Sequence, residues 1–251
     1  MPDSLVWKLR RVTALSPGEV KDIHRLCSDV RTAAAEQVLV REGQAVNAAL
    51  LIHHGWAFRY RLFSDGRRQI VDFLIPGDFC EPNAFTVRNS DFSVQTITEV
   101  TYSVTPLRDL LRQLHDSPRI GIAFWWLTAH EEAVLRAHLV AVGRMTAYER
   151  IAYLLWEMWK RLDMVRMTAS PVFEFPATQE MIADAMGMCL VHANRTLRRL
   201  EREDVIRRAG RTIRILDARR LADIAHAAGI LHLEHMPLAT ERWLREAGRR
   251  A

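Results

Sequence analysis

The stretch at residues 178–202, TQEMIADAMGMCLVHANRTLRRLER, limits what this chain can fold into more than any other feature. Two short helical patterns meet there at Gly187, and the apolar side chains of each pattern recur on one face. The spacing predicts a first helix capped by Thr178, a tight turn at the glycine, and a second helix from about Leu190 to Glu203. The expected inward-facing residues are Ile182, Ala183 and Met186 in the first helix and Ala193, Leu197 and Leu200 in the second.

The opposite face of the second helix is rich in arginine. Residues 195–220 contain ten arginines, no lysine and four acidic residues, a local charge of +6. Residues 1–143 have no net charge, so residues 144–251 carry the whole formal excess of +5. A cationic surface concentrated in this way is typical of proteins that bind a phosphate backbone, and the alternative is an ordinary solvated helix face. The outward face is expected to hold Val191, Arg195, Arg198 and Arg202, flanked by His192, Asn194 and Arg199.

This arrangement has the geometry of a helix that enters the DNA major groove. Arg195 can donate two hydrogen bonds to a guanine, Asn194 can pair with adenine, and Val191 can contact a thymine methyl group. Residues 205–216, VIRRAGRTIRIL, predict two short strands around Gly210, a wing that would contact the flanking backbone. We expect the DNA-binding residues to be Thr178, Gln179, Val191, His192, Asn194, Arg195, Arg198, Arg199, Arg208 and Arg211.

The pattern in residues 30–106 has a period of two instead. In WAFRYRL, residues 56–62, four apolar side chains alternate with Arg59 and Arg61, and Asp65-Gly66 predicts a hairpin turn. Further turn signals at residues 42–43, 76–77 and 89–90 predict short strands that form a small jelly roll. Before them, SPGE at residues 16–19 predicts a capped helix start.

Residues from about Leu107 to Gly143 are predicted to be helical. One apolar stripe repeats every seven residues, while His130 interrupts a second. We interpret the stripe as a two-helix dimer seam, with packing on the jelly roll alone as the alternative, and we expect the tryptophans at 125–126 to pack against the roll. The stripe consists of Ile120, Leu127, Val134 and Ala141.

A new helix is predicted after Gly143, where Thr146 and Glu149 have the spacing of a capping box. We therefore expect a first domain over residues 1–143 and a DNA-binding domain with a helical tail over residues 144–251.

The chain resembles the cyclic-AMP receptor protein and fumarate-nitrate regulator (CRP/FNR) superfamily of bacterial transcription factors over nearly its whole length. The similarity lies in residues 50–79 (LLIHHGWAFRYRLFSDGRRQIVDFLIPGDF), the helix to 143, AYERIAYLL at 147–155, and residues 178–202. It implies an α+β protein with a cyclic-nucleotide-binding-like β jelly roll, a long dimerisation helix and a C-terminal winged helix-turn-helix. The implied partners are double-stranded DNA, a second copy of the chain and RNA polymerase, and an effector would act across Gly143.

The sequence departs from the family where an effector would bind. Members that bind cyclic nucleotides have a Gly-Glu pair followed by Arg-Ser or Arg-Thr, because the phosphate needs a cation. Here Glu81 follows Cys80, and Phe92 before Ser93 occupies the arginine position. Glu81, Phe92 and Ser93 are thus the effector-pocket candidates, but binding of cyclic AMP is not expected. The three cysteines cannot supply the four ligands of an iron-sulfur cluster. We predict no cofactor.

The recognition helix departs as well. Leu190 and Val191 occupy positions where many relatives have a polar pair, so an operator sequence cannot be carried over. Cys189 occupies a position where serine or threonine commonly caps the helix. An inert thiol is favoured there over a redox switch.

Two other functions remain as alternatives. A cupin-like metal-dependent enzyme would use His53 and His54, but adjacent strand residues point to opposite faces, and Cys80 occupies a place where a third histidine is wanted. His232 and His235 are expected to be surface or packed residues. A second alternative is a regulator whose jelly roll is only a dimer scaffold.

The sequence argues against a membrane protein. Its longest near-continuous apolar run, residues 120–129, is much shorter than the roughly 20 residues that span a bilayer. The first residues, MPDSLVWKLRR, lack the apolar stretch of a signal peptide. We expect a cytoplasmic protein that does not bind membranes.

Overall fold

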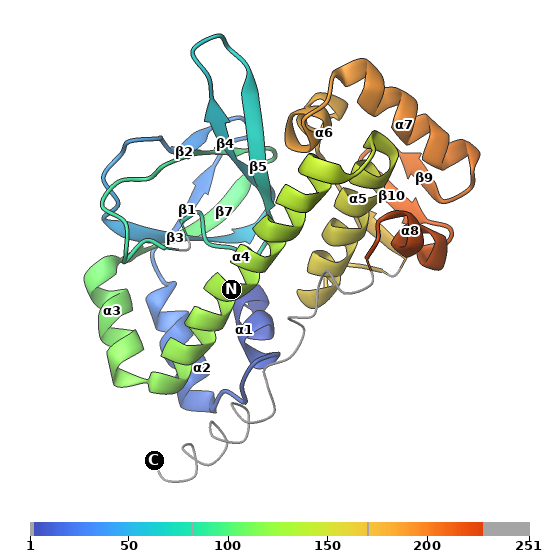
Figure 1. The fold of residues 1–251 in the computed structure, drawn as a ribbon. Helices are drawn as coiled ribbons and strands as arrows, with labels where there is room; N and C mark the ends of the chain where they lie inside the picture. The colour runs from blue at the N-terminus through green and yellow to red at the C-terminus, as the bar shows by residue number, and fades with distance from the viewer. Residues whose placement is uncertain (1–2, 82, 170, 228–251) are drawn as a thin grey trace. The chain divides into compact units, whose positions relative to one another are not determined.

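The computed structural model describes residues 3–81, 83–169 and 171–227, and it has the expected α+β fold (Figure 1). The described residues form two compact units. The first contains residues 3–59 and 74–133, and the second contains residues 60–73 and 134–227. No helix in these described ranges is both long enough and apolar enough to cross a bilayer.

The strands before residue 107 form two sheets. One has the order β1-β7-β3 with antiparallel pairing, and the other has the order β2-β6-β4-β5. The predicted turn at Asp65-Gly66 connects β4 and β5, whereas Asn89 pairs with Ala45 in an isolated bridge and forms no corner. The strands are β1 (Val30–Ala33), β2 (Val38–Val40), β3 (Ala48–His54), β4 (Ala57–Leu62), β5 (Arg68–Leu74), β6 (Ser93–Thr96) and β7 (Val100–Pro106).

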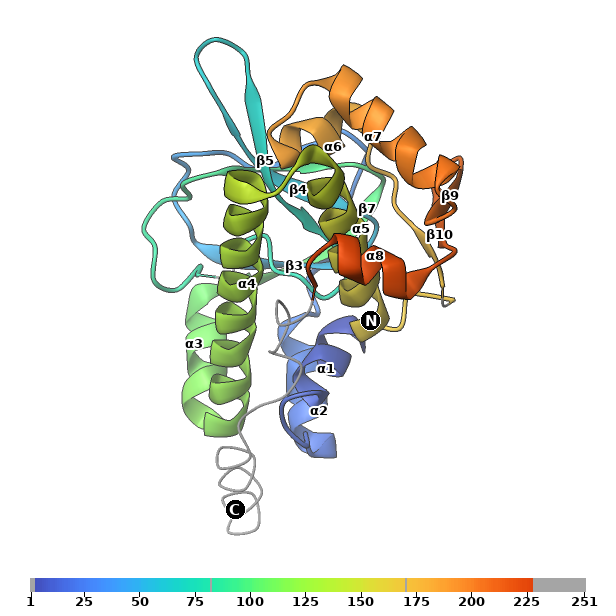
Figure 2. The ribbon, with the colours of Figure 1, turned by 45° about the vertical axis from the view of Figure 1, so that its right-hand side comes forward.

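Two apolar clusters hold the first unit together. Ile52 and Val100 of one sheet pack with Ala57 and Val94 of the other, so this cluster fills the space between the sheets. The second cluster lies between the three-stranded sheet and the surrounding helices, and Figure 2 shows α3 beside the first half of α4. The helices are α1 (Asp3–Arg10), α2 (Pro17–Leu26), α3 (Leu107–Asp116) and α4 (Pro118–Arg144).

Local signals explain where these helices begin. Ser16 and Glu19 form the predicted capping box at the start of α2. The helix expected over 107–143 is divided at Ser117, because Pro118 lacks an N–H and its ring disfavours helical backbone in the preceding residue. The helix α4 then ends at Arg144, one residue beyond Gly143.

The apolar stripe predicted to be a dimer seam faces inward instead. Ile120, Val134 and Ala141 are buried within the single chain, and Leu127 packs against the second apolar cluster. A seven-residue repeat fits contacts within one chain as well as contacts between two chains. The exposed apolar side chains of α4 lie on roughly the opposite face, and they are Trp125, Leu135, Leu139 and Val140.

The tryptophan pair is also divided between these two faces. Trp126 is buried and stacks on His130, but Trp125 is 74% exposed, so the prediction that both tryptophans pack against the jelly roll is wrong for Trp125.

The second unit has a winged-helix arrangement in which α7 lies at the periphery (Figure 2). Its three-stranded antiparallel sheet has the order β8-β10-β9. The strand β8 was not predicted from the sequence, although Phe173 and Phe175 are buried with a period of two. The elements are α5 (Ala147–Met164), β8 (Val172–Glu174), α6 (Gln179–Met186), α7 (Leu190–Arg202), β9 (Ile206–Ala209), β10 (Thr212–Ile215) and α8 (Ala218–Ile224). The tail after residue 227, with His232 and His235, lies outside the described residues.

The helix α5 is buried along most of its length, and residues 60–73 of the β4–β5 hairpin pack in the same unit. Arg161 Nη1 donates to Asp72 Oδ1 at 2.7 Å and to Glu157 Oε1 at 3.1 Å, and Nη2 donates to the carbonyl oxygen of Phe73 at 2.8 Å. Nearby, Arg68 pairs with Asp184 of α6 at 2.8 Å. The hairpin is therefore tied by charged groups to the helices that carry the helix-turn-helix.

Candidate nucleic-acid interface

The two helices of the predicted helix-turn-helix are α6 and α7. Thr178 caps α6 by accepting a hydrogen bond from the N–H of Met181 at 3.1 Å. Gly187 ends this helix in the left-handed region, with φ of 61°, which favours a residue without a Cβ. Cys189 is the N-cap of α7 but makes no side-chain cap hydrogen bond, as expected for a thiol. The turn therefore connects α6 to α7 at the place that the spacing predicted.

The inward face of α7 is the predicted one. Ala193, Leu197 and Leu200 are completely buried, as is Met186 of α6. Burying a leucine side chain contributes about 1.5–3 kcal/mol to stability, so these contacts fix the orientation of α7 about its own axis. The residues on the opposite side of the helix, Val191, Arg195, Arg198 and Arg202, then face outward.

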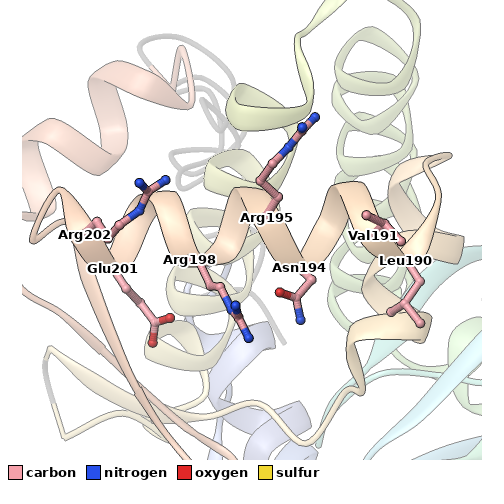
Figure 3. Close-up of a pocket in the computed structure, with 7 residues that line it drawn as sticks. All are labelled: Leu190, Val191, Asn194, Arg195, Arg198, Glu201 and Arg202. Carbon is pink, nitrogen blue, oxygen red and sulfur yellow. The ribbon is translucent and has the colours of Figure 1, made fainter.

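The outward face of α7 forms a shallow, open surface (Figure 3). Val191 is 76% exposed, and Leu190 beside it is also exposed. Arg195 and Arg202 extend to one side of the helix axis, whereas Asn194 and Arg198 extend to the other. The surface therefore combines an apolar end with cationic groups along the rest of the helix. It is lined by Leu190, Val191, Asn194, Arg195, Arg198, Glu201 and Arg202.

The predicted DNA-binding arginines differ in whether they form ion pairs within the chain. Arg199 pairs with Glu203 at 2.7 Å and lies over the ring of Tyr148 at 4.0 Å, and Arg208 pairs with Glu201 at 2.7 Å. These arginines lower the pKa values of both glutamates. Arg195, by contrast, is exposed and forms no hydrogen bond or ion pair with the described residues. Arg195 is therefore an exposed cation available to a ligand, as are Arg198 and Arg211, whereas Arg199 and Arg208 are already paired.

Asn194 and Gln179 are linked across the two helices. Asn194 Nδ2 donates to Gln179 Oε1, so this amide holds the start of α6 against α7. An Asn194 contact with adenine would replace or share this hydrogen bond. Both side chains remain half-buried, while Thr178 and His192 are exposed.

The predicted wing is present as β9 and β10. Thr212 pairs with Ala209, and Gly210 turns the chain with φ of 59°. Arg211 is exposed in this turn. The structure thus presents Arg211 on the wing, whereas Arg208 is half-buried through its ion pair with Glu201.

Two of the three effector-pocket candidates lie beside Arg59, which was not among the site residues predicted from the sequence. Arg59 of β4 is 3% exposed, and its guanidinium lies 5.5 Å from the ring centroid of Phe92. Glu81 is buried nearby and accepts a hydrogen bond from the hydroxyl of Ser90 at 3.2 Å. Ser93 Oγ accepts from the N–H of Glu42 at 3.0 Å. The structure therefore brings Glu81 and Phe92 together around Arg59, while Ser93 contacts a different segment.

Burial raises the pKa of Glu81 from its ordinary value of 4.5, and the charge of Arg59 opposes this shift. The folded chain therefore binds the proton more tightly than the unfolded chain does. The stability that comes from this group is present below the unfolded pKa and is lost as the pH rises through the folded pKa. We therefore expect the unfolding free energy of Glu81→Gln to rise relative to that of the wild type as the pH increases above 4.5. Urea unfolding at several pH values measures this gain, and a difference that stays constant with pH would contradict it.

The histidines and cysteines do not form a metal site in the described part of the chain. No group of three or more metal-ligating side chains is present there. Burial lowers the pKa of His53 to about 4, and His54 is exposed. Burial raises the pKa of Cys80 to about 12 and that of Cys27 to about 11, which disfavours the reactive thiolate, whereas Cys189 is exposed.

Comparisons with known proteins match both parts of the chain. A family described as "Crp-like helix-turn-helix domain" matches residues 149–224, and one described as "Cyclic nucleotide-binding domain" matches residues 30–117. The transcriptional activatory protein AadR of Rhodopseudomonas palustris is 29% identical over 216 residues, which cover 85% of this chain and 87% of AadR. The nitrogen fixation regulation protein FixK of Rhizobium meliloti is 30% identical over 168 residues, 66% of this chain and 73% of FixK.

A solved structure has the same fold. FixK2 from Bradyrhizobium japonicum superimposes with a TM-score of 0.70 and 23% identity, covering 78% of this chain and 96% of FixK2.

Proposed function

Because this chain belongs to the CRP/FNR superfamily of transcription regulators, we propose that it binds a two-fold-symmetric operator as a homodimer. It is a transcription regulator with a Crp-like helix-turn-helix, and its relatives do not support the cupin-like enzyme. The two copies of α7 would enter successive major grooves about 34 Å apart. The observation that carries this proposal is the exposed cationic face of α7, held in place by its buried apolar face.

The roles of individual residues follow from their exposure and partners. Arg195, which has no ion-pair partner in the described chain, would donate to a guanine edge. Val191 would contact a thymine methyl group, and Asn194 would pair with adenine. Arg198, Arg199 and the wing arginines 208 and 211 would contact phosphates, with Thr178, Gln179 and His192 at the edge of the contact. Arg199 and Arg208 would have to share their charge with Glu203 and Glu201.

The homodimer would form through the exposed apolar side chains of α4. Leu139 is 72% exposed, and Trp125 lies two heptads before it on the same side of the helix. Two-fold symmetry brings the same surface of both chains together, so one apolar stripe is enough for an isologous contact.

Three further properties belong to this proposal. The protein would act in the cytoplasm, where bacterial DNA is transcribed, it would contact RNA polymerase at the promoter, and it would have no catalytic activity. The first domain, residues 1–143, would control or support the DNA-binding domain, residues 144–251, across Gly143.

Arg195→Ala tests the recognition role most directly. We expect it to weaken binding to the selected operator by about 1–3 kcal/mol and to relax preference at one base pair, because a bidentate contact is lost. Binding to random DNA should change much less. Fluorescence anisotropy at a fixed salt concentration measures both affinities.

The matched control is Arg214→Ala, which removes another exposed arginine from the same unit. It should leave base preference unchanged. Equal losses on operator and random DNA for Arg195→Ala would show that Arg195 contacts only phosphate, contrary to the role assigned here.

A further inference from the structure

Arg59 lies beside two of the effector-pocket candidates, Glu81 and Phe92. Its Nε donates to the carbonyl oxygen of Cys80 at 3.1 Å, and its Nη2 donates to the carbonyl oxygen of Phe79 at 2.6 Å. The ring of Phe92 lies within cation–π distance of the guanidinium. The effector-pocket candidates Glu81 and Phe92 are thus neighbours of a cation that the chain itself supplies.

The same guanidinium reaches the long helix. Arg59 Nη2 lies 3.1 Å from Oε2 of Glu131 on α4, and both side chains are largely buried. A planar guanidinium can contact carbonyl oxygens, a carboxylate and an aromatic ring at once, which a lysine ammonium cannot reproduce. Arg59 therefore connects three segments that are distant in sequence: β4, the residues after β5, and α4.

This geometry leaves little for an anionic effector to bind. A cyclic phosphate needs a cation with free donors, but Nε and Nη2 of Arg59 already face carbonyl oxygens and the carboxylate of Glu131. A phosphate would have to displace Glu131, and that displacement would leave a largely buried carboxylate without this cation.

We propose that Arg59 is a positioning residue that takes the place of an effector, holding α4 through Glu131 so that the regulator binds its operator without a small molecule in this site. The inference rests on the proposed function, since its readout is operator binding. It favours the alternative in which the jelly roll is a dimer scaffold. Because α4 is continuous from Pro118 to Arg144, a loss of this anchor would affect how the helix presents its dimer face.

The test is chemical rescue of Arg59→Ala. This change should weaken operator binding on the order of tenfold, the usual size of a coupling between two sites. Ethylguanidinium has the atoms that the substitution removes, so millimolar ethylguanidinium chloride should restore most of the affinity. Sodium chloride at the same concentration should not restore the affinity. The variant Arg59→Lys should keep only part of the wild-type affinity for the operator. Arg61→Ala, an exposed arginine two residues along the same strand, is the matched control and should bind like the wild type.

A second variant covers the case in which Arg59→Ala fails to fold. Glu131→Gln keeps the side-chain shape and removes the charge, and it should weaken operator binding in the same direction with unchanged circular dichroism and dimer mass. Wild-type affinity in both variants would overturn the proposal, as would tighter operator binding by the wild type when cyclic AMP is added. Failure of the wild type to bind any selected operator would instead contradict the proposed function itself.

Discussion

Replacing Arg161 with methionine is expected to lower the free energy of unfolding by about 3–5 kcal/mol, because the change leaves buried carboxylates without their cation. Arg161 is 8% exposed on its side chain and contacts Asp72, Glu157 and the carbonyl oxygen of Phe73. Methionine fills similar space but donates no hydrogen bonds. Urea unfolding followed by far-UV circular dichroism measures the loss.

The loss should depend on pH. Burial raises the pKa of Glu157, while Arg161 opposes that shift, so removing Arg161 raises this pKa further. A raised carboxyl pKa contributes stability at low pH that is lost as the pH rises. The penalty of Arg161→Met should therefore be smaller at acidic pH than at neutral pH.

Two controls separate charge burial from packing. Arg214→Met, at an exposed position of the same unit, should change the unfolding free energy by less than about 0.5 kcal/mol. Adding Asp72→Leu and Glu157→Leu to Arg161→Met should recover much of the loss, since apolar residues often replace a buried ion group at little cost. A destabilisation that is independent of pH and unrelieved by these changes would mean that the arginine acts through packing.

Leu139→Glu is expected to dissociate the homodimer. Burying a leucine contributes about 1.5–3 kcal/mol, and a homodimer contains the substitution once in each chain. The dimer dissociation constant should therefore rise by roughly 10² to 10⁴. The substitution also places two carboxylates, one from each chain, in an apolar contact, which adds a cost of desolvation. Sedimentation equilibrium measures the dissociation constant, and binding to a two-half-site operator should weaken in parallel.

Leu111→Glu is the matched control, because Leu111 is an exposed leucine that belongs to α3 and not to α4. It should leave the dimer intact. An unchanged dimer in Leu139→Glu would show that the chain associates through another surface.

Much of the helix-turn-helix could be predicted from the sequence because its signals are local. The cap at Thr178, the left-handed glycine at 187 and the spacing of Ala193, Leu197 and Leu200 all act within one or two turns of helix. These residues fix which face of α7 is exposed, and the exposed arginines follow from that.

What could not be predicted depends on contacts between distant segments. Period-two alternation separates Arg59 from the apolar side chains of its strand, but it does not show that the residues after β5 and Glu131 of α4 bury the guanidinium. Likewise, Asp72 lies 89 residues from Arg161, so no local pattern reveals their pairing. The seven-residue stripe at 120–141 had the right period for a helix but could not tell contacts within the chain from contacts between chains.

The central claim is tested most directly by selecting bound sequences from random double-stranded DNA at a stated salt concentration, with and without cyclic AMP. We predict a two-fold-symmetric site, with half-sites about one helical turn apart, recovered equally under both conditions. Recovery of no enriched sequence, or of a single asymmetric half-site, would contradict a dimeric sequence-specific regulator.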